Sequence, residues 1–427
     1  MNRILFFVLI GLVFLLMDWY VYQAIRTVSR NVSGEAQRVI FLVYWGFTAL
    51  SVGIFLFIQL APPDLIGRHT RTFLYAGIMI PYFSKFFAVL FILIDDIGRF
   101  FRWVASLFYR PDVREAADNA TRTNMPQTDM ITRSDFLMKT ALVAGAIPLI
   151  GFSWGILSGA HDYRIRRVKL ALKNLPSGFE GMRIAQLSDI HSGSFFNKTA
   201  VKGGVEMLLN QKPDLIFFTG DLVNNTAEEV SDYIDIFRRV KAPLGVFSII
   251  GNHDYGDYVA WPNQQVKRQN LANLKEAHRL LGWNLMLDEN QILTQNGDKI
   301  ALIGIENWGA GERWPKYGNL IKAYEGTKEY PVKLLLSHDP SHWDAQVRPT
   351  FPDIDAMFAG HTHGMQFGVE IGSFKWSPSQ YVYPQWAGLY QQNGQQLYVN
   401  RGYGYLGYPG RVGILPEITI FELTRGI

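Results

Sequence analysis

Long apolar runs concentrate in the first third of the 427-residue chain. Three of them, at residues 4–25, 39–61 and 73–94, each supply the roughly 20 apolar residues that a membrane-spanning helix needs. A fourth run, at 140–160, is richer in glycine, alanine and proline, and we expect it to stay in the chain as an uncleaved membrane segment. The pattern predicts an α-helical transmembrane region with three helices within residues 1–95, followed by this fourth segment.

Residues 96–139 separate the third apolar run from the fourth. Arginines alternate with large aromatic residues over 98–110, as in an interfacial amphipathic helix, and a polar stretch follows. We interpret the whole segment as a basic amphipathic linker. Two loops on one side of the membrane carry three and seven basic residues, and the loop opposite carries two, so the positive-inside rule predicts that the chain beyond residue 160 is extracytoplasmic. If 140–160 does not cross the bilayer, that part is cytoplasmic.

Two charged residues, Asp18 and Lys85, interrupt the apolar runs. An ionisable residue within a membrane segment raises the possibility of a transport or signalling role. The plainer alternatives are that Lys85 reaches towards the membrane surface or faces a neighbouring helix. Transporters are commonly built from internal repeats, and none is visible here, so we interpret the region as an anchor.

The pattern changes in the remainder of the chain. Short apolar runs alternate with polar stretches of helical character, such as 199–211 and 227–240. This alternation indicates an α/β domain with a buried sheet, which we assign to residues 161–427. The predicted strands lie within 182–191, 213–223, 244–254, 298–306, 332–340, 354–364, 395–400 and 417–423.

Composition removes several classes of protein from consideration. The chain has no cysteine, which excludes disulfides, thiolate zinc sites and cysteine nucleophiles. The net charge is only +4 and the basic residues are scattered, so we expect no nucleic-acid partner.

Metal-capable side chains follow five of the predicted strands. Because ligands of α/β sheets gather beyond the carboxyl ends of the strands, these side chains are expected to converge. Oxygen and imidazole donors without sulfur suit divalent ions such as Mn, Fe or Zn. The candidates are Asp189 and His191, Asp221, Asn252 with His253 and Asp254, His338, and His361 with His363.

Each motif has a plainer interpretation when it is taken singly. His338 could be a strand-end histidine bonded to backbone, Asn252 a turn residue, and Asp221 a helix cap. Asp254 could orient His253 or simply shape the turn. The metal-site interpretation rests on the presence of all five motifs together and on their order along the chain. The histidines outside the motifs are expected to be structural: His69, His161, His278 and His342.

The ordered motifs D-x-H, G-D, G-N-H-D, a histidine after an apolar strand, and G-H-x-H resemble the calcineurin-like metallophosphoesterase superfamily. All five occur, in order, over residues 184–364. The closing segment LYVNRGYGYLGYPGRVGILPEITIFEL resembles a membrane-anchored bacterial subgroup of that superfamily. The resemblance covers residues 164–427 and implies a two-sheet α/β sandwich of the metallophosphoesterase type.

The resemblance also implies a role for each motif residue. Two divalent metal ions would be bound, and His253 would face the substrate phosphoryl group as the catalytic residue. The implied ligands are Asp189, His191 and His363 for one metal, Asn252, His338 and His361 for the other, and Asp221 as the bridge between them.

The implied function is that of a membrane-anchored two-metal phosphoesterase. It would hydrolyse a phosphodiester or phosphomonoester of a lipid or cell-envelope component at a bacterial inner membrane, with the lipid bilayer as its partner. One alternative is a UDP-diacylglucosamine-type pyrophosphatase of lipid A synthesis, and another is a non-catalytic metal-binding membrane scaffold. Aromatic residues in loops could form an apolar rim at the membrane or belong to the core; the tryptophans among them are Trp261, Trp308, Trp314, Trp376 and Trp386.

Overall fold

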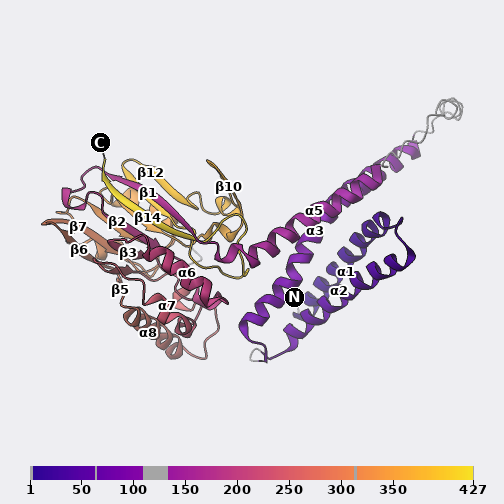
Figure 1. Ribbon diagram of the computed structural model, residues 1–427, viewed down its shortest axis with the longest axis horizontal. Coiled ribbons are helices and arrows are strands. Elements are labelled where there is room, and N and C mark those ends of the chain that lie inside the picture. Colours follow the sequence, from indigo (N-terminus) through magenta and orange to yellow (C-terminus); the bar gives the residue numbers. More distant parts are fainter. Residues whose placement is uncertain (1–2, 63–64, 109–132, 312–314, 427) are drawn as a thin grey trace. The chain divides into compact units, whose positions relative to one another are not determined.

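The computed structural model describes residues 3–62, 65–108, 133–311 and 315–426. It divides into two compact units, Met1–Ser153 and Trp154–Ile427 (Figure 1). Most of the polar half of the predicted linker and one rim candidate, Trp314, lie outside the described residues.

The first unit is built from long helices. By length and composition alone, four helices of the described chain could cross a membrane. Residues 96–108 continue the third helix without a break, so this part of the predicted linker is the end of that helix. The helices are α1 (Arg3–Val28), α2 (Gly34–Leu60), α3 (Arg68–Phe108) and α5 (Arg133–Leu157), of which α5 continues into the second unit.

Asp18 is fully buried in this unit and has several donors around it. The Lys85 ammonium forms an ion pair with its carboxylate. The Tyr82 hydroxyl donates to the same carboxylate at 2.7 Å, and the Tyr44 hydroxyl lies 3.2 Å from it. Lys85 therefore faces the neighbouring helices, which is one of the two plain alternatives that its position suggests.

The second unit contains two six-stranded sheets and a separate hairpin (Figure 1). In order across the first sheet lie β1 (Arg164–Leu172), β14 (Glu417–Arg425), β2 (Arg183–Leu187), β3 (Leu215–Phe218), β4 (Val246–Ser248) and β5 (Asn284–Leu285). Across the second lie β12 (Gly388–Gln392), β13 (Gln395–Val399), β9 (Ala356–Ala359), β8 (Lys333–Leu336), β7 (Asp298–Gly304) and β6 (Glu289–Gln295). The hairpin pairs β10 (Val369–Ile371) with β11 (Phe374–Trp376).

The two sheets pack face to face through apolar side chains of their central strands. Phe217 of β3 and Phe358 of β9 meet with ring centroids 5.0 Å apart. The outer face of the first sheet packs against α6 (Lys198–Leu209), α7 (Ile234–Phe237) and α8 (Gln264–Leu281). The outer face of the second packs against α9 (Leu320–Tyr324) and residues 343–354. The result is the predicted two-sheet α/β sandwich.

Each of the eight predicted strand segments contains a strand, and α6 occupies the first predicted helical stretch. The second stretch is mostly a 3-10 helix, η5 (Ala227–Tyr233), before the short α7. The predictions missed β1, whose sequence RIRRVKLAL exposes basic residues along one face and so lacks a continuous apolar run. They also missed α8, where polar residues outnumber the apolar stripe.

Candidate metal centre

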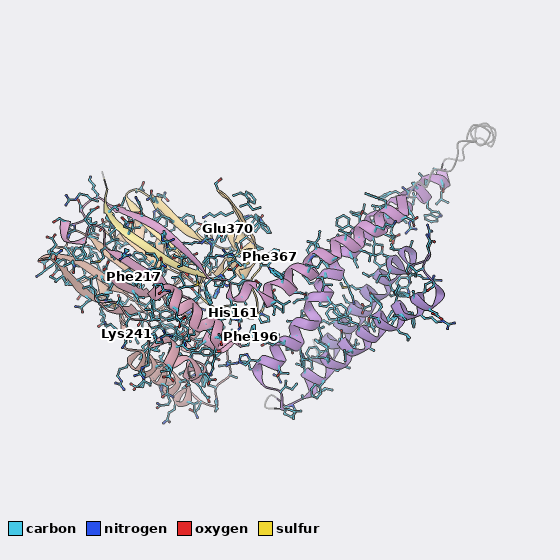
Figure 2. The ribbon with its side chains drawn as sticks, viewed as in Figure 1. His161, Phe196, Phe217, Lys241, Phe367 and Glu370 are labelled. Carbon is cyan, nitrogen blue, oxygen red and sulfur yellow. The ribbon has the colours of Figure 1, made fainter. Side chains whose placement is uncertain are left out.

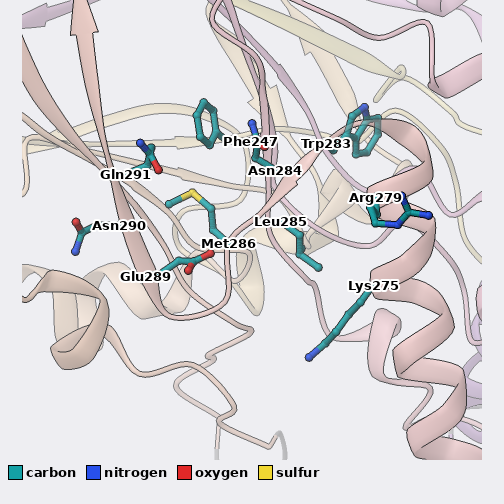
Figure 3. Close-up of a pocket in the computed structure, with 10 residues that line it drawn as sticks. All are labelled: Phe247, Lys275, Arg279, Trp283, Asn284, Leu285, Met286, Glu289, Asn290 and Gln291. Carbon is teal, nitrogen blue, oxygen red and sulfur yellow. The ribbon is translucent and has the colours of Figure 1, made fainter.

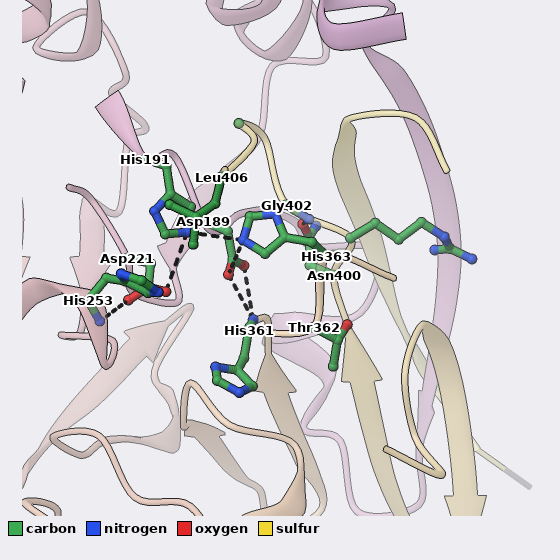
Figure 4. A network of polar contacts seen from close by, with 12 residues as sticks. Asp189, His191, Asp221, His253, His361, Thr362, His363, Asn400, Gly402 and Leu406 are labelled. Atoms are coloured by element: carbon green, nitrogen blue, oxygen red, sulfur yellow. Dashed lines mark hydrogen bonds and ion pairs between the residues drawn. The ribbon is translucent and has the colours of Figure 1, made fainter. Parts of the chain in front are cut away.

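The candidate ligands follow parallel strands of both sheets. β2, β3 and β4 run parallel in one sheet, and β8 and β9 run parallel in the other. The loops after β2 and β3 are joined by backbone hydrogen bonds, from Asp189 to Gly220 and from His191 to Asp221. All five predicted motifs therefore meet where the two sheets end. Figure 4 shows residues of four of the motifs: Asp189, His191, Asp221, His253, His361 and His363.

The ligand loops use unusual backbone geometry. Left-handed φ values are uncommon for residues other than glycine, and such conformations cluster at functional sites. Glycines beside these positions allow close approach: a Cβ on Gly360 would collide with the Asp189 carboxylate, and one on Gly251 with that of Asp221. The left-handed candidates are Asp189 (φ 52°), His191 (48°), Asp221 (60°), His361 (72°) and His363 (50°).

The first group of side chains joins Asp189, His191 and His363. The Nε2 atoms of the two histidines lie 3.0 Å apart, and His363 Nε2 is 3.3 Å from Asp189 Oδ1. All three residues are buried, and their donor atoms lie close enough together to hold one ion.

The second group joins Asn252, His338 and His361. The amide oxygen Oδ1 of Asn252 lies 3.1 Å from His338 Nε2 and 2.8 Å from His361 Nδ1. Between the two groups lies the Asp221 carboxylate, whose Oδ2 is 3.2 Å from His338 Nε2 and 3.5 Å from His191 Nε2. The geometry thus brings together all seven predicted ligands.

The hydrogen bonds around His338 test whether a cation fits. Its Nδ1 lies 2.6 Å from the carbonyl oxygen of Thr219, which can only accept, so Nδ1 carries the proton of the neutral ring. Its Nε2 lone pair then faces the oxygens of Asp221 and Asn252, which are acceptors too. The Asn252 oxygen is fixed in this direction because its amide nitrogen donates to the Tyr258 hydroxyl at 2.7 Å. A divalent cation would satisfy these converging lone pairs.

The other metal position shows the same arrangement. His191 Nδ1 lies 3.1 Å from Asn224 Oδ1, and the Asn224 amide nitrogen donates to Ser194. His191 therefore donates through Nδ1 and turns a bare Nε2 towards His363 and Asp221. The donor set of imidazole and carboxylate groups, with one amide, is suited to a first-row divalent ion.

Burial and mutual charge shift the pKa values within the site. Burial lowers the pKa of His191 to about 3, so this ring is neutral and available as a ligand. Burial alone would also lower the pKa of His338, but without a cation in the site the adjacent Asp221 carboxylate raises it to about 10, so a proton on Nε2 takes the place that a metal ion would fill. Burial alone would raise the pKa of Asp221, whereas His338 and His253 hold it well below its usual value. Asp221 is therefore a carboxylate at neutral pH.

His253 stands apart from the two ligand groups. Its backbone N–H donates to Asp221 Oδ1 at 2.8 Å, while its ring Nδ1 lies 2.8 Å from the carbonyl of Asn224. The half-buried ring stacks on Tyr258 with centroids 4.3 Å apart. With Nδ1 occupied as a donor, Nε2 remains as the atom that can meet a substrate.

Asp254 has the turn role rather than the role of orienting the ring of His253. Its carboxylate accepts the backbone N–H groups of Gly251, Asp221, Leu222 and Val223 at 2.8–3.2 Å. The three bonds from Asp221, Leu222 and Val223 tie the loop after β4 to the loop after β3, and the bond from Gly251 closes the turn itself.

Besides Tyr258, the residues that contact the candidate ligands and were not predicted include Asn224, Tyr383 and Arg411. Asn224 holds His191 through its side chain and His253 through its carbonyl. The Tyr383 hydroxyl lies 2.7 Å from His361 Nε2. The buried Arg411 guanidinium lies 3.1 Å from His363 Nδ1 and donates to backbone carbonyls of residues 401, 402 and 404. The sequence contains only weak signals for them, namely polar residues directly after the G-D motif and an arginine within the glycine-rich C-terminal segment.

The histidines outside the motifs do not join the site. His342 bonds to Ser337 and Gln346, and His278 bonds to Ser248. A cavity of about 630 Å³ also lies apart from it, between α8 and the edge strands β5 and β6, and none of the candidate ligands lines this cavity (Figure 3). Lys275, Arg279 and Glu289 line it without the convergent donors of the metal centre, so the chemistry is assigned to the loops described above.

Comparison with known proteins agrees with this fold. Residues 182–365 match the calcineurin-like phosphoesterase family, and residues 2–160 match the family described as "Probable Calcineurin-like phosphoesterase, transmembrane domain". The chain is 31% identical over 305 residues to the uncharacterized metallophosphoesterase YkuE of Bacillus subtilis, covering 69% of this chain and 98% of that protein. The chain therefore belongs to the calcineurin-like metallophosphoesterase family, and it is a membrane-associated phosphoester hydrolase.

Two other relatives have more specific names. Phosphodiesterase YaeI of Escherichia coli is 26% identical over 302 residues, covering 69% of this chain and 100% of that protein. UDP-2,3-diacylglucosamine pyrophosphatase LpxG of Chlamydia trachomatis is 25% identical over 301 residues, covering 61% of this chain and 89% of LpxG. The predicted family and enzyme class are confirmed.

Proposed function

We propose that the site binds two divalent metal ions and hydrolyses a phosphoester presented at the membrane. Asp189, His191 and His363 would hold one ion, Asn252, His338 and His361 the other, and Asp221 would bridge them. The observation that carries the proposal is the convergence of ring nitrogens from both sheets on the Asp221 carboxylate: Nε2 of His191 and Nε2 of His338 both point at it, while Nδ1 of each ring donates elsewhere. Mn, Fe or Zn would suit this donor set.

When bound, a pair of divalent cations supplies positive charge that polarises a phosphoryl oxygen and acidifies a water molecule. The protein's own contribution is to position the substrate and to move a proton. His253 is fixed by its Nδ1 bond to Asn224 and its stacking on Tyr258, and its Nε2 would hydrogen-bond to the phosphoryl group. As water oxygen bonds to phosphorus and the ester bond breaks, the departing oxygen would take a proton from Nε2 of the doubly protonated His253 ring, and the proton released by the attacking water would restore that ring.

We further propose that the substrate is a phosphodiester or phosphomonoester of a lipid or cell-envelope component. A catalytic domain at 161–427, carried by membrane helices within 1–95 and 140–160 and the linker 96–139, would meet such a substrate without leaving the bilayer. The excess of basic residues in two loops favours a bacterial inner membrane with an extracytoplasmic catalytic domain. The relative LpxG favours a second candidate, the pyrophosphate of a UDP-diacylglucosamine-type lipid.

The test uses the full chain, purified in detergent and stripped with a chelator. Turnover of bis-p-nitrophenyl phosphate and p-nitrophenyl phosphate is measured with Mn²⁺, Zn²⁺, Mg²⁺ or no metal. We expect metal-dependent turnover that falls at least about a thousandfold in Asp221→Asn, because the charge between the two groups is lost. In His253→Ala we expect a fall of about 10²–10⁴-fold.

Asp235→Asn is the matched control, because Asp235 is an exposed aspartate of the same domain, and it should keep wild-type turnover. Equal activity in the Asp221→Asn variant would contradict the proposal. Should neither generic ester turn over, lipid pyrophosphates are tested next. A protein that binds two metal ions per chain and hydrolyses none of these substrates would be the non-catalytic scaffold.

A further inference from the structure

The hairpin β10–β11 has one polar face and one apolar face. Cross-strand partners share a face of a hairpin, and the register pairs Ile371 with Phe374 and Glu370 with Lys375. Val369 pairs with Trp376 and lies on the same face as Ile371 and Phe374. The apolar face is therefore made of Val369, Ile371, Phe374 and Trp376.

The polar face is the one that is bonded to the domain. Glu370 forms ion pairs with Arg166 of β1 and with Arg401, the latter at 2.5 Å (Figure 2). The Lys375 ammonium donates to the carbonyl of Ala387 at 2.6 Å. These contacts fix which way the hairpin faces.

The apolar face is consequently turned outward. Ile371 is 73% exposed and Phe374 is 61% exposed. Tyr381, whose hydroxyl lies 3.4 Å from the Trp376 indole nitrogen, and Val382 extend the exposed surface. A hairpin facing water would show the opposite arrangement, with charged residues outside, and clustered exposed apolar residues mark a surface that contacts something apolar.

Within the same unit, the hairpin is joined to the end of the membrane helix α5. Phe367, just before β10, forms a β-bridge with Val412. The neighbouring Arg411 donates its backbone N–H to the carbonyl of Gly155 in the last turn of α5 at 3.1 Å. Gly155 is packed so closely against this segment that a Cβ would collide with Tyr408 and Val412. The α5 helix is one of the four candidate membrane spans, so the hairpin is attached to the C-terminal end of a candidate span.

We propose that the apolar face of β10–β11, with Tyr381 and Val382, is a bilayer-contact surface that inserts between lipid headgroups. Continuity with α5 selects lipid as the occupant, because a bilayer is always present at the end of that helix. The same segment continues to Tyr383, which is bonded to His361 of the metal centre. The surface therefore runs from the bilayer to the reaction site, and under the proposed function it would deliver a phosphoester headgroup.

This surface overlaps the rim that the aromatic residues suggested only at Trp376 and Tyr381. Trp386 is only 3% exposed and packs in a small core with Ile414, and Trp376 is half-buried against Phe367. The exposed positions are instead aliphatic residues, one phenylalanine and one tyrosine of the hairpin and the segment after it.

The absence of cysteine allows a direct test of lipid contact. The full chain carrying Phe374→Cys is labelled with an environment-sensitive fluorophore and placed in nanodiscs of phosphatidylethanolamine and phosphatidylglycerol, with or without brominated acyl chains. Gln392→Cys, at the exposed turn end of the β12–β13 hairpin, is the matched control. We expect blue-shifted emission that brominated lipid quenches at least twofold at position 374, with no quenching at 392.

Equal, weak quenching at both positions would overturn the proposal. Concentration-dependent cross-linking between two chains through Phe374→Cys, without quenching, would also overturn it, since a second copy would then cover the face.

The contribution to catalysis is tested separately with the double variant Ile371→Ser/Phe374→Ser. Turnover of the soluble bis-p-nitrophenyl phosphate should stay within twofold of wild type, while turnover of a phosphoester embedded in vesicles should fall at least tenfold. Unchanged turnover on vesicles would contradict the delivery role. A wild-type protein without any hydrolysis would refute the proposed function alone, because the quenching result does not depend on activity.

Discussion

The membrane unit and the catalytic unit each bury a cluster of charged and polar side chains, but the two clusters are organised in opposite ways. In the membrane unit, the Asp18 carboxylate is surrounded by donors: the Lys85 ammonium, the Tyr82 hydroxyl and the Tyr44 hydroxyl. Lys85 also lies 4.4 Å from the ring centroid of Tyr82 and 4.9 Å from that of Tyr44. The cluster is satisfied by its own members.

In the catalytic unit, two histidine rings direct Nε2 at a carboxylate, and in their neutral form each presents a lone pair there. His338 and His191 both use Nδ1 to donate elsewhere and turn Nε2 towards the Asp221 carboxylate. Such an arrangement is costly without a positive charge between the atoms, because each lone pair has lost its water. A buried charge alone therefore does not indicate a binding site, whereas converging lone pairs without a donor do.

The comparison also bears on the role of the intramembrane charges. An ionisable residue in a membrane segment is a candidate for transport or signalling. Here the Asp18 carboxylate is paired with Lys85 and bonded to tyrosines of the other two helices, which favours a structural role in the anchor.

The largest expected difference between the two clusters is a loss of stability when one partner of the Asp18–Lys85 ion pair is removed and the other is left. Lys85→Met leaves the Asp18 carboxylate buried without its counter-charge, and we expect the bundle to lose about 3 kcal/mol of unfolding free energy. The double variant Asp18→Asn/Lys85→Met removes both charges and should recover most of this loss. Unfolding in SDS, followed by helical circular dichroism of the full chain, measures both variants.

Arg30→Gln is the control, because its ion pair with Asp135 involves a side chain that is 57% exposed and should contribute less than about 1 kcal/mol. A double variant as unstable as Lys85→Met would show that the two residues act independently. Loss of hydrolysis in a stably folded Lys85→Met protein would revive a functional role for the pair.

A smaller effect should follow from removing metal, and it should depend on pH. Without metal, a proton on His338 is the only positive charge that this ring can offer Asp221, and its pKa is raised to about 10. A raised pKa stabilises the fold fully below the unfolded value of about 6.5, and this contribution is lost as pH rises through about 10. The chelated protein should therefore lose stability between pH 7 and pH 9.

Bound metal should displace that proton and flatten the dependence. At ten times the dissociation constant, each ion should add about 1.4 kcal/mol. Thermal unfolding of the full chain in detergent, with chelator and with Mn²⁺ at each pH, gives the difference curve. Parallel curves with and without Mn²⁺ would show that His338 does not exchange its proton for metal. The Lys85→Met variant should show the same metal-dependent shift as wild type.

The sequence predicted the fold class, the family and a set of ligand candidates that the structure brings together, because short motifs at strand ends have a fixed relation to the sheet edge. It did not reveal what holds those residues. Asn224, Tyr383 and Arg411 lie 22 to 48 residues along the chain from the histidines that they contact, so no local spacing marks them. The hairpin was missed for a similar reason. Each of its strands has only three residues, which is too short to give a recognisable alternating pattern. Which of its faces is outside becomes clear only from the ion pair between Glu370 and Arg401.

The smallest of these effects concerns Tyr383, and it tests how far the contrast between the clusters extends. Its hydroxyl lies 2.7 Å from His361 Nε2, so it can fix the ring with Nδ1 directed at Asn252. Tyr383→Phe should lower the affinity for the metal ion held by His361 and Asn252 about tenfold, the equivalent of one hydrogen bond. The affinity for the ion held by Asp189 and His191 should not change.

Stepwise calorimetric titration of the chelated protein resolves the two ions. Tyr381→Phe, on a side chain that is 76% exposed, should leave both affinities as in wild type. If Tyr383→Phe lowers the affinity for both ions equally, the hydroxyl supports the domain as a whole, as the tyrosines around Asp18 support the helix bundle. Only the contacts of the histidines with Asp221 would then distinguish the metal centre.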